Sequence, residues 1–400
     1  MIQYTTIPAI RDAKLLKPPP EVGERWPVML FSHGLGGSRN AYSHICGSLA
    51  SHGIIVVAPD HRDGSAPISF IKDSPTSNLK AVDYQYYPHQ STPEVEKGRN
   101  EQLKIRCWEL GMAHDALLKI DVGTSLTNTQ ATQGSDNLES FRSKLDVHRP
   151  GKISWAGHSF GATTITQFLK SVYHKGSILY PYCTKALSEQ ITPASPVSLL
   201  DLWAMPLTGS STASLYNQPL PSNCGSPSSP PLVVLSEGFY KWTTNFQHTL
   251  HIATHSSSKT AAEAHIFYPV SAAHLSQSDF GILFPWLTKK ALKTDDPDRT
   301  LRLNVRAVLE SLRRNGISVA DTSALDMEIG SNQDDNTQLN GATLGQDRLI
   351  LTPNGNVRGW VAVDAKAECE RLSLPGHMKG SAEGEPNSPD EAVMKYEINQ

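Results

Sequence analysis

The chain has 400 residues, 38% of them hydrophobic, and a formal net charge of −3. This charge excludes the strongly basic surface that nucleic-acid binding requires, and no apolar run approaches the roughly 18 residues of a membrane span. The five cysteines are scattered and form no Cys-x-x-Cys spacing, which argues against a disulfide framework or a zinc site.

Six short apolar runs rich in β-branched residues alternate with helical patterns along the chain. They lie at residues 28–31, 54–58, 153–156, 199–203, 232–235 and 264–268. This alternation predicts an α/β fold with a mostly parallel sheet and crossover helices. The segment before Trp26 includes Lys17-Pro-Pro-Pro20 and has no room for the antiparallel strand pair that usually opens such a sheet. We therefore expect the opening strands to be missing.

Apolar residues at helical spacing predict helices at residues 41–51, 95–120, 138–145 and 299–314. The region 206–231 is rich in Ser, Pro, Gly and Asn, which predicts a long irregular connection. The apolar stretch 280–287 could contact a lipid surface transiently, although burial beneath the helix that follows residue 159 is favoured.

Beyond residue 318 the composition turns polar and acidic. Such a segment cannot bury enough apolar surface to fold alone. We expect one domain at residues 1–317 and a mostly disordered tail at residues 318–400, in which a short strand at 349–351 or 360–363 is allowed. At the other end, Met-Ile-Gln-Tyr-Thr-Thr has neither a basic nor an apolar region. This favours a cytoplasmic protein, provided that no signal peptide precedes Met1.

Gly157-His-Ser-Phe-Gly161 directly follows the third apolar run. This pattern is typical of a nucleophile elbow, in which a strand ends at a tight turn and a serine is exposed above the sheet edge. The two glycines let neighbouring backbone pass where a Cβ would clash. Ser159 is therefore the candidate nucleophile.

A serine nucleophile needs a histidine base and an acid that orients this base. In α/β-hydrolases the chain order is Ser, then Asp or Glu, then His. His274, in a loop after the last apolar run, is the candidate base, while Asp201 and Glu237 both remain candidates for the acid. Asp60 and Asp63 precede Ser159 and violate this order.

Other histidines fit the chemistry less well. His158 is too close in sequence to Ser159 to act as its base, and we expect it to pack beneath the elbow. His248, His251 and His255 have helical spacing, but no Glu completes a His-Glu-x-x-His motif, so we expect solvated side chains rather than metal ligands.

Phe31-Ser-His-Gly-Leu-Gly-Gly37 follows the first apolar run. Its glycines allow a backbone amide to turn toward the elbow. The amides of Leu35 and of Phe160, the residue after the nucleophile, are the candidate oxyanion hole. The segment lacks the glycine spacing of a dinucleotide-binding fold and the lysine of a phosphate-binding loop.

Several segments, in this order, resemble the platelet-activating-factor acetylhydrolase family, calcium-independent phospholipases A2 with an α/β-hydrolase fold. They are Phe31-Ser-His-Gly-Leu-Gly-Gly37, Leu49-Ala-Ser-His-Gly53, Asp60-His-Arg-Asp63, Arg99-Asn-Glu-Gln102, Gly157-His-Ser-Phe-Gly161, Leu200-Asp-Leu-Trp203 and Ser236-Glu237. The resemblance implies a triad of Ser159, His274 and Asp201, and it implies Leu35 and Phe160 as the oxyanion hole. It thus favours Asp201 over Glu237.

The resemblance also implies an activity, which is hydrolysis of a short sn-2 acyl ester of platelet-activating factor or an oxidised phospholipid. The products would be a lysophospholipid and a short carboxylic acid, formed through an acyl-enzyme without metal or cofactor. Trp203 would line the acyl pocket, or else pack in the core. The alternatives are a general short-chain carboxylesterase or polyester hydrolase, and a non-catalytic hydrolase-like interaction protein.

Overall fold

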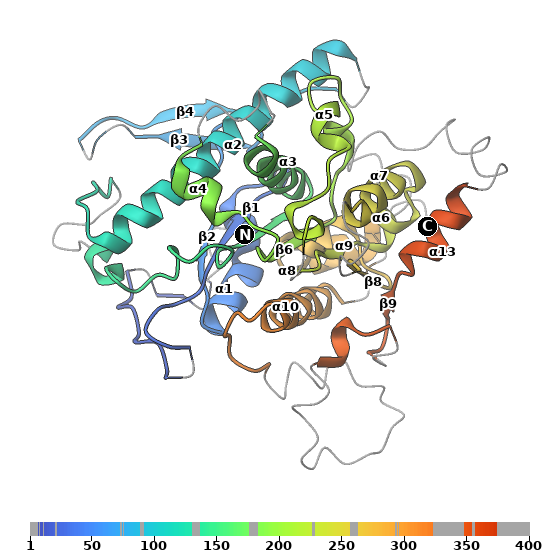
Figure 1. Ribbon diagram of the computed structural model, residues 1–400. Helices are drawn as coiled ribbons and strands as arrows, with labels where there is room; N and C mark the ends of the chain where they lie inside the picture. The colour runs from blue at the N-terminus through green and yellow to red at the C-terminus, as the bar shows by residue number, and fades with distance from the viewer. Residues whose placement is uncertain are drawn as a thin grey trace.

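The computed structural model has a central sheet of seven strands with helices on both faces (Figure 1). The residues that it describes are 7, 9–10, 12–20, 22–72, 74, 76–88, 92–129, 137–175, 183–225, 229–256, 263–292, 294, 296–322, 348–353 and 357–373. The strand order is β2-β1-β5-β6-β7-β8-β9, and neighbours are parallel except for the antiparallel pair β8 and β9. The predicted α/β fold with a mostly parallel sheet is confirmed.

Each of the six predicted apolar runs overlaps a strand of this sheet, and β9 is an additional seventh strand. The strands are β1 (Val28–Ser32), β2 (Ile55–Val57), β5 (Ser154–His158), β6 (Val197–Leu200), β7 (Leu232–Val234), β8 (His265–Pro269) and β9 (Trp360–Ala362). Strand β6 begins before the predicted run 199–203 and ends at Leu200. Asp201 therefore comes directly after the carboxyl end of this strand, the edge where ligands bind in parallel sheets.

Two apolar cores lie on opposite faces of the sheet. Because successive side chains of a strand alternate between faces, Val28 and Leu30 of β1 contribute to one core while Met29 and Phe31 contribute to the other. Helices α2 (Pro93–Val122) and α3 (Phe160–His174) cover the first face, and α1 (Ser43–Ser51) and α10 (Pro297–Arg314) cover the second (Figure 1). Burial on both faces explains why the strands are continuous apolar runs.

Shorter elements connect these layers. The helices are η2 (Arg39–Tyr42), η3 (Asn137–Phe141), α4 (Lys185–Gln190), η4 (Met205–Leu207), α5 (Ala213–Tyr216), η5 (Pro221–Asn223), α6 (Glu237–Lys241), α7 (Thr243–Thr254), η6 (His274–Gln277), α8 (Phe280–Leu283), α9 (Pro285–Leu292), η7 (Arg348–Leu351) and α13 (Ala365–Ser373). A separate antiparallel hairpin, β3 (Ile68–Ile71) with β4 (Lys80–Asp83), was not predicted. Its strands leave most of their side chains exposed, so they carry little apolar signal.

Strand β2 forms one edge of the seven-stranded sheet, and β9 forms the opposite edge. Among the described residues before Val28, the only strand-like pairing is an isolated parallel bridge between Trp26 and Leu145. Trp26 donates its backbone amide to Lys144, and the Asp146 amide donates back to Trp26. This bridge fastens the segment before β1 to the segment before β5.

Part of the predicted tail belongs to the sheet. Strand β9 pairs with β8, and the Trp360 ring stacks on Phe267 with centroids 5.4 Å apart. The strand allowed at 360–363 is thus present, whereas 349–351 forms a 3-10 turn with Ile350 buried. A boundary at residue 317 would separate this strand from its sheet. For residues 323–347 and 374–400, which lie outside the described residues, the disordered tail stays a prediction.

Burial of the stretch 280–287 beneath the helix after Ser159 was the favoured expectation, and it is wrong. Helix α8 packs against η6 and α10, while Trp286 at the start of α9 is 71% exposed. The short run of apolar residues is interrupted by Pro285, which begins a new helix and directs Trp286 outward. Among the described residues, no helix combines the length and the apolarity needed to cross a membrane.

We expect Trp360→Ala to lower the free energy of unfolding by about 3 kcal/mol, because it leaves a cavity at the sheet edge. The loss also removes the hydrogen bond from Trp360 Nε1 to the Ile350 carbonyl, 2.9 Å long. Urea denaturation followed by circular dichroism measures the change. Trp286→Ala is the matched control and should stay within about 0.5 kcal/mol of the parent protein. Equal stability of the two variants would contradict the docking of β9.

Candidate active site

Ser159 lies in a strained turn between β5 and α3. Its φ and ψ angles are 56° and −121°, a conformation that non-glycine residues rarely adopt. A Cβ on Gly161 would overlap the Ser32 carbonyl, and one on Gly157 would come within 2.5 Å of the Gly161 carbonyl. Only glycines therefore allow β5, α3 and the end of β1 to approach this closely, as predicted for an elbow.

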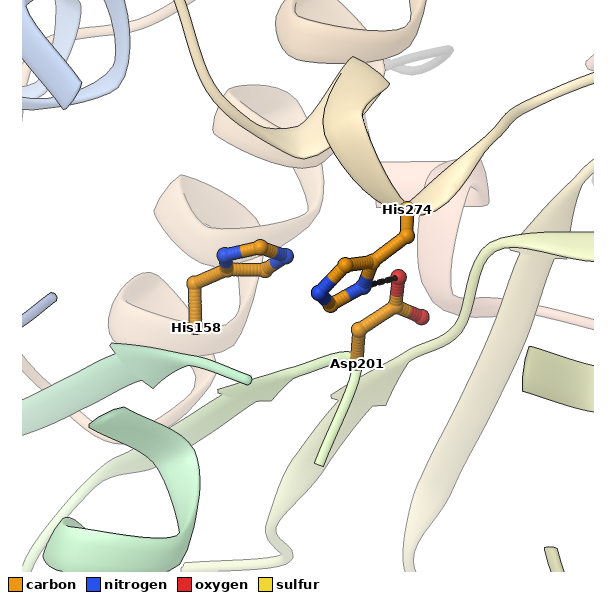
Figure 2. A group of neighbouring side chains, drawn as sticks. All are labelled: His158, Asp201 and His274. Carbon is orange, nitrogen blue, oxygen red and sulfur yellow. Dashed lines mark hydrogen bonds and ion pairs between the residues drawn. The ribbon is translucent and has the colours of Figure 1, made fainter. Parts of the chain in front are cut away.

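Asp201 and His274 are joined by a hydrogen bond. Asp201 Oδ2 lies 2.8 Å from His274 Nδ1 (Figure 2). Asp201 Oδ1 accepts a hydrogen bond from the Ser236 amide at 2.5 Å. Asp201 is completely buried and has a positive φ of 42°, a backbone conformation that residues other than glycine rarely adopt. A carboxylate at Nδ1 keeps the ring proton there and leaves Nε2 as the basic nitrogen.

The His274 ring is held between two other rings. It stacks on Phe239 and on His158, with centroid distances of 4.5 Å to each. Figure 2 shows the His158 ring beside His274. This differs from the expected position beneath the elbow. Because His158 directly precedes Ser159, the stack places His274 next to the elbow.

Glu237, the second predicted acid, lies elsewhere. Its Oε2 accepts the Ser271 amide at 2.7 Å, and its Oε1 pairs with Lys241 Nζ at 2.9 Å. Burial opposes ionisation, but the hydrogen bonds from Lys241 and Ser271 hold the pKa of Glu237 below its usual value. The structure thus brings Asp201, and not Glu237, to His274. Asp60, which was set aside because it precedes Ser159, has its Oδ1 3.9 Å from His33 Nε2.

A buried tyrosine connects the predicted oxyanion loop to the elbow. The Gly34 amide donates to Tyr42 Oη at 3.0 Å, and Tyr42 Oη lies 2.8 Å from His158 Nδ1. Desolvation keeps the pKa of His158 well below its usual value, so its neutral Nδ1 accepts the Tyr42 proton. Phe160 is the first residue of α3, and amides in a first turn have no acceptor within their helix. Leu35 follows Gly34 directly.

A buried ion pair supports the same loop from below. Arg106 Nε donates to Asp63 Oδ2 at 2.6 Å, and both side chains are fully buried. One Arg106 Nη donates to the His33 carbonyl at 2.8 Å and the other to Ser65 Oγ at 2.5 Å. Sequence reasoning missed Arg106 and Tyr42. Asp63 stood in a segment that carried the resemblance, but no spacing assigned it a partner.

His158, Asp201 and His274 offer nitrogen and oxygen atoms within 4.8 Å of one another, so distance alone would allow a metal ion. His274 Nδ1 is bonded to Asp201 Oδ2 and His158 Nδ1 to Tyr42, whereas His158 Nε2 has no hydrogen-bond partner among the described residues. The histidines at positions 248, 251 and 255 were expected to be solvated, but they are not fully solvated. All three are half-buried. Tyr216 bonds to His248 Nδ1 at 2.7 Å and stacks on His251, and His255 stacks on His251.

The sequence profile of the family described as "Platelet-activating factor acetylhydrolase, isoform II" matches residues 2–336. The chain belongs to this family. A Schizosaccharomyces pombe protein named "Putative phospholipase A2" is 29% identical over 75% of this chain and 70% of its own length. Proteins named "Platelet-activating factor acetylhydrolase" from Bos taurus and Gallus gallus are 38% and 28% identical over 41% and 59% of this chain.

The matched part of this acetylhydrolase family member spans only 35% of the bovine and 50% of the chicken relative. Among solved structures, a ferulic acid esterase from Streptomyces cinnamoneus aligns with 77% of this chain and 71% of its own, at 15% identity and a TM-score of 0.46.

Trp203 forms part of a cavity wall beside the elbow of this family member. The cavity has a volume of ≈ 190 Å³ and is lined by Arg99, Trp203 and Met205 among others. The Trp203 ring lies 5.7 Å from the Phe160 ring, and its carbonyl accepts Thr163 Oγ1 from the first turn of α3. Trp203 is only 5% exposed, so it is both a core residue and a wall of this cavity.

Glu109 predicts how the stability of the protein depends on pH. Its Oε2 accepts His61 Nδ1 at 2.7 Å, and burial raises the pKa of Glu109 to about 7 from 4.5. Below pH 4.5 the carboxyl is protonated in both folded and unfolded chains, and ionisation of the buried group then costs stability as the pH rises toward 7.

We therefore expect the parent protein to lose up to about 3 kcal/mol of stability relative to Glu109→Gln between pH 4.5 and 7. Unfolding in urea at a series of pH values measures this difference, in which the titrating groups that do not interact with Glu109 cancel. A parent protein that gains stability relative to the variant over this range would contradict the assignment.

Proposed function

We propose that the chain is a serine esterase that hydrolyses the short sn-2 acyl ester of platelet-activating factor or of oxidised phospholipids. The observation that carries this proposal is the Asp201–His274 hydrogen bond beside the Ser159 elbow. A buried carboxylate, a histidine with its Nε2 kept basic and an elbow serine are the components of a nucleophilic triad. Membership of the acetylhydrolase family supports the lipid substrate.

In the first step His274 Nε2 removes the Ser159 proton while Oγ attacks the ester carbonyl carbon. The carbonyl oxygen becomes an oxyanion and accepts hydrogen bonds from the backbone amides of Leu35 and Phe160. The intermediate then breaks its bond to the glycerol oxygen, which receives the proton from His274. The lysophospholipid leaves, and the short acyl group stays esterified to Ser159.

In the second step His274 removes a proton from water, which attacks the acyl-enzyme. Collapse of the second tetrahedral intermediate breaks the bond to Ser159 Oγ, and His274 returns the proton to this oxygen. The products of this step are a short carboxylic acid and free enzyme. Asp201 stabilises the imidazolium of His274 in both steps without taking its proton.

The triad predicts two separable effects of mutation. A fluorophosphonate probe should label the parent protein, and Ser159→Ala should abolish labelling because the attacking oxygen is gone. Asp201→Asn should lower kcat by about three to four orders of magnitude, since it favours the wrong histidine tautomer. Glu237→Gln is the control, and its kcat should change little.

The reverse ranking of the two acid variants would move the acid to Glu237. Absence of labelling in a folded sample would favour the alternative of a hydrolase-like interaction protein without turnover.

The substrate proposal predicts a preference for a phospholipid ester over a simple one. We expect a 2-acetyl phosphocholine glycerolipid to have a higher kcat/KM than 4-nitrophenyl acetate, because its glycerol backbone and headgroup add binding energy that the small ester lacks. Turnover of the simple acetate alone would support the general carboxylesterase instead.

Exposed Trp286 offers an apolar contact to lipid, so Trp286→Ala should slow hydrolysis of vesicle-bound lipid but not of the soluble acetate.

A further inference from the structure

The wall of the cavity beside the elbow contains a buried cation. Arg99, from α2, lines the cavity together with Trp203 and is only 4% exposed. Its guanidinium carbon lies 5.4 Å from the Trp203 ring centre and 5.8 Å from that of Phe160, the residue that follows the nucleophile. The cation is therefore close to the side chain of Phe160, although no triad residue is part of the cavity lining.

Among the described residues, Arg99 has no partner of opposite charge within ion-pair distance. One Nη donates to the neutral Gln102 Oε1 at 2.8 Å, and Nε has no hydrogen-bond partner. Within the part of the chain that the structure describes, no carboxylate oxygen lies within 4.0 Å of the guanidinium. The Trp203 Nε1 donor in the same wall is also buried without a partner. Two donors of this wall thus remain unsatisfied.

The aromatic rings around Arg99 account for only part of its stabilisation. Tyr87, Trp203 and Phe160 lie within the range of cation–π attraction. A ring face attracts the charge but does not satisfy the N–H groups, and burial of a charge without hydrogen bonds is costly. Desolvation accordingly lowers the pKa of Arg99, and the more distant charge of Asp63 offsets only part of this effect.

Arg106 shows how the same helix treats a structural arginine. It lies two turns further along α2 and also faces the Phe160 ring, at 4.6 Å. Unlike Arg99, it is paired with Asp63 and bonds to the His33 carbonyl and to Ser65. The two residues share helix, burial and aromatic neighbour, but among the described residues only Arg106 is paired with a counter-ion.

We propose that Arg99 is a specificity-determining residue whose counter-ion is an anionic oxygen group of the ester substrate, a carboxylate or a phosphate, bound in this cavity. This inference rests on the proposed esterase function. A guanidinium can donate two parallel hydrogen bonds to either group. The carboxylate would terminate an oxidised acyl chain, and the phosphate would belong to the headgroup.

Two pairs of substrates separate these sources. The first compares sn-2 glutaryl with sn-2 valeryl phosphatidylcholine, which differ by a terminal carboxylate. The second compares a 2-acetyl phosphocholine glycerolipid with the same acetyl glycerolipid that lacks phosphocholine. For each pair the measured quantity is the ratio of kcat/KM for the anionic member to that for its matched counterpart, so a general loss of activity cancels.

Arg99→Gln should lower this ratio by about tenfold to a hundredfold in one pair, the range expected for loss of a charged hydrogen bond. A fall in the first pair assigns the acyl carboxylate, and a fall in the second assigns the phosphate. Unchanged ratios in both pairs overturn the proposal, including the case in which all activities fall together.

Two variants control for charge. Glu96 lines the same cavity and is hydrogen-bonded to Ser210 at 2.6 Å, so Glu96→Gln removes a negative charge and should raise the ratio in the same pair. Exposed Arg62 is outside the cavity wall, and Arg62→Gln should leave the ratio as it is. Should Arg99→Gln fail to fold, the Glu96 variant decides, and an unchanged ratio overturns the proposal.

Binding without turnover distinguishes this inference from the proposed function. The Ser159→Ala protein is titrated with glutarate and with inorganic phosphate while its tryptophan fluorescence is recorded. The same titrations are then carried out on the double variant that carries both Ser159→Ala and Arg99→Gln. Saturable binding that the second substitution removes supports the anion site, even if no ester is hydrolysed and the esterase proposal fails. Without ester turnover, absence of saturable binding overturns the anion site as well.

Discussion

The approach of α3 to the end of β1 determines where every group of the site lies. Ser32 is paired with Gly157 in the sheet, and its carbonyl occupies the space that a side chain at Gly161 would need. Because Gly157 and Gly161 have no side chains, the first turn of α3 can lie directly over the carboxyl end of the strands. Ser159 and Phe160 are thereby presented to the loop that begins at His33, with no room for adjustment.

Around this contact the polar groups form a rigid frame. Tyr42 bridges the Gly34 amide and His158, and Arg106 fixes the His33 carbonyl from the other side. Buried charges such as the Arg106–Asp63 pair add little net stability, since desolvation offsets their attraction. Their contribution here is geometric, because an oxyanion hole acts only if its amides are in place before the charge develops.

Sequence reasoning could find what local pattern encodes. Apolar runs located the parallel strands, and the glycine spacing located the elbow, because both reflect contacts that a few neighbouring residues decide. Spacing could not choose between Asp201 and Glu237, since both follow strands, and only the tertiary bonds of Glu237 to Lys241 and Ser271 separate them. Tyr42 was beyond reach, since it bonds to a histidine 116 residues away. Strand β9 was allowed rather than predicted, because a polar segment surrounds it.

Strand β9 makes the order of synthesis matter for the site. The Val270 amide donates to the Gly359 carbonyl at 2.8 Å, just before the loop that carries His274, and β9 closes the edge of β8. Ser159 and Asp201 emerge from the ribosome with strands that can pair at once. The base loop gains its outer support only when residues beyond 360 have emerged. A growing chain therefore carries its nucleophile and acid for some time before the histidine between them is braced.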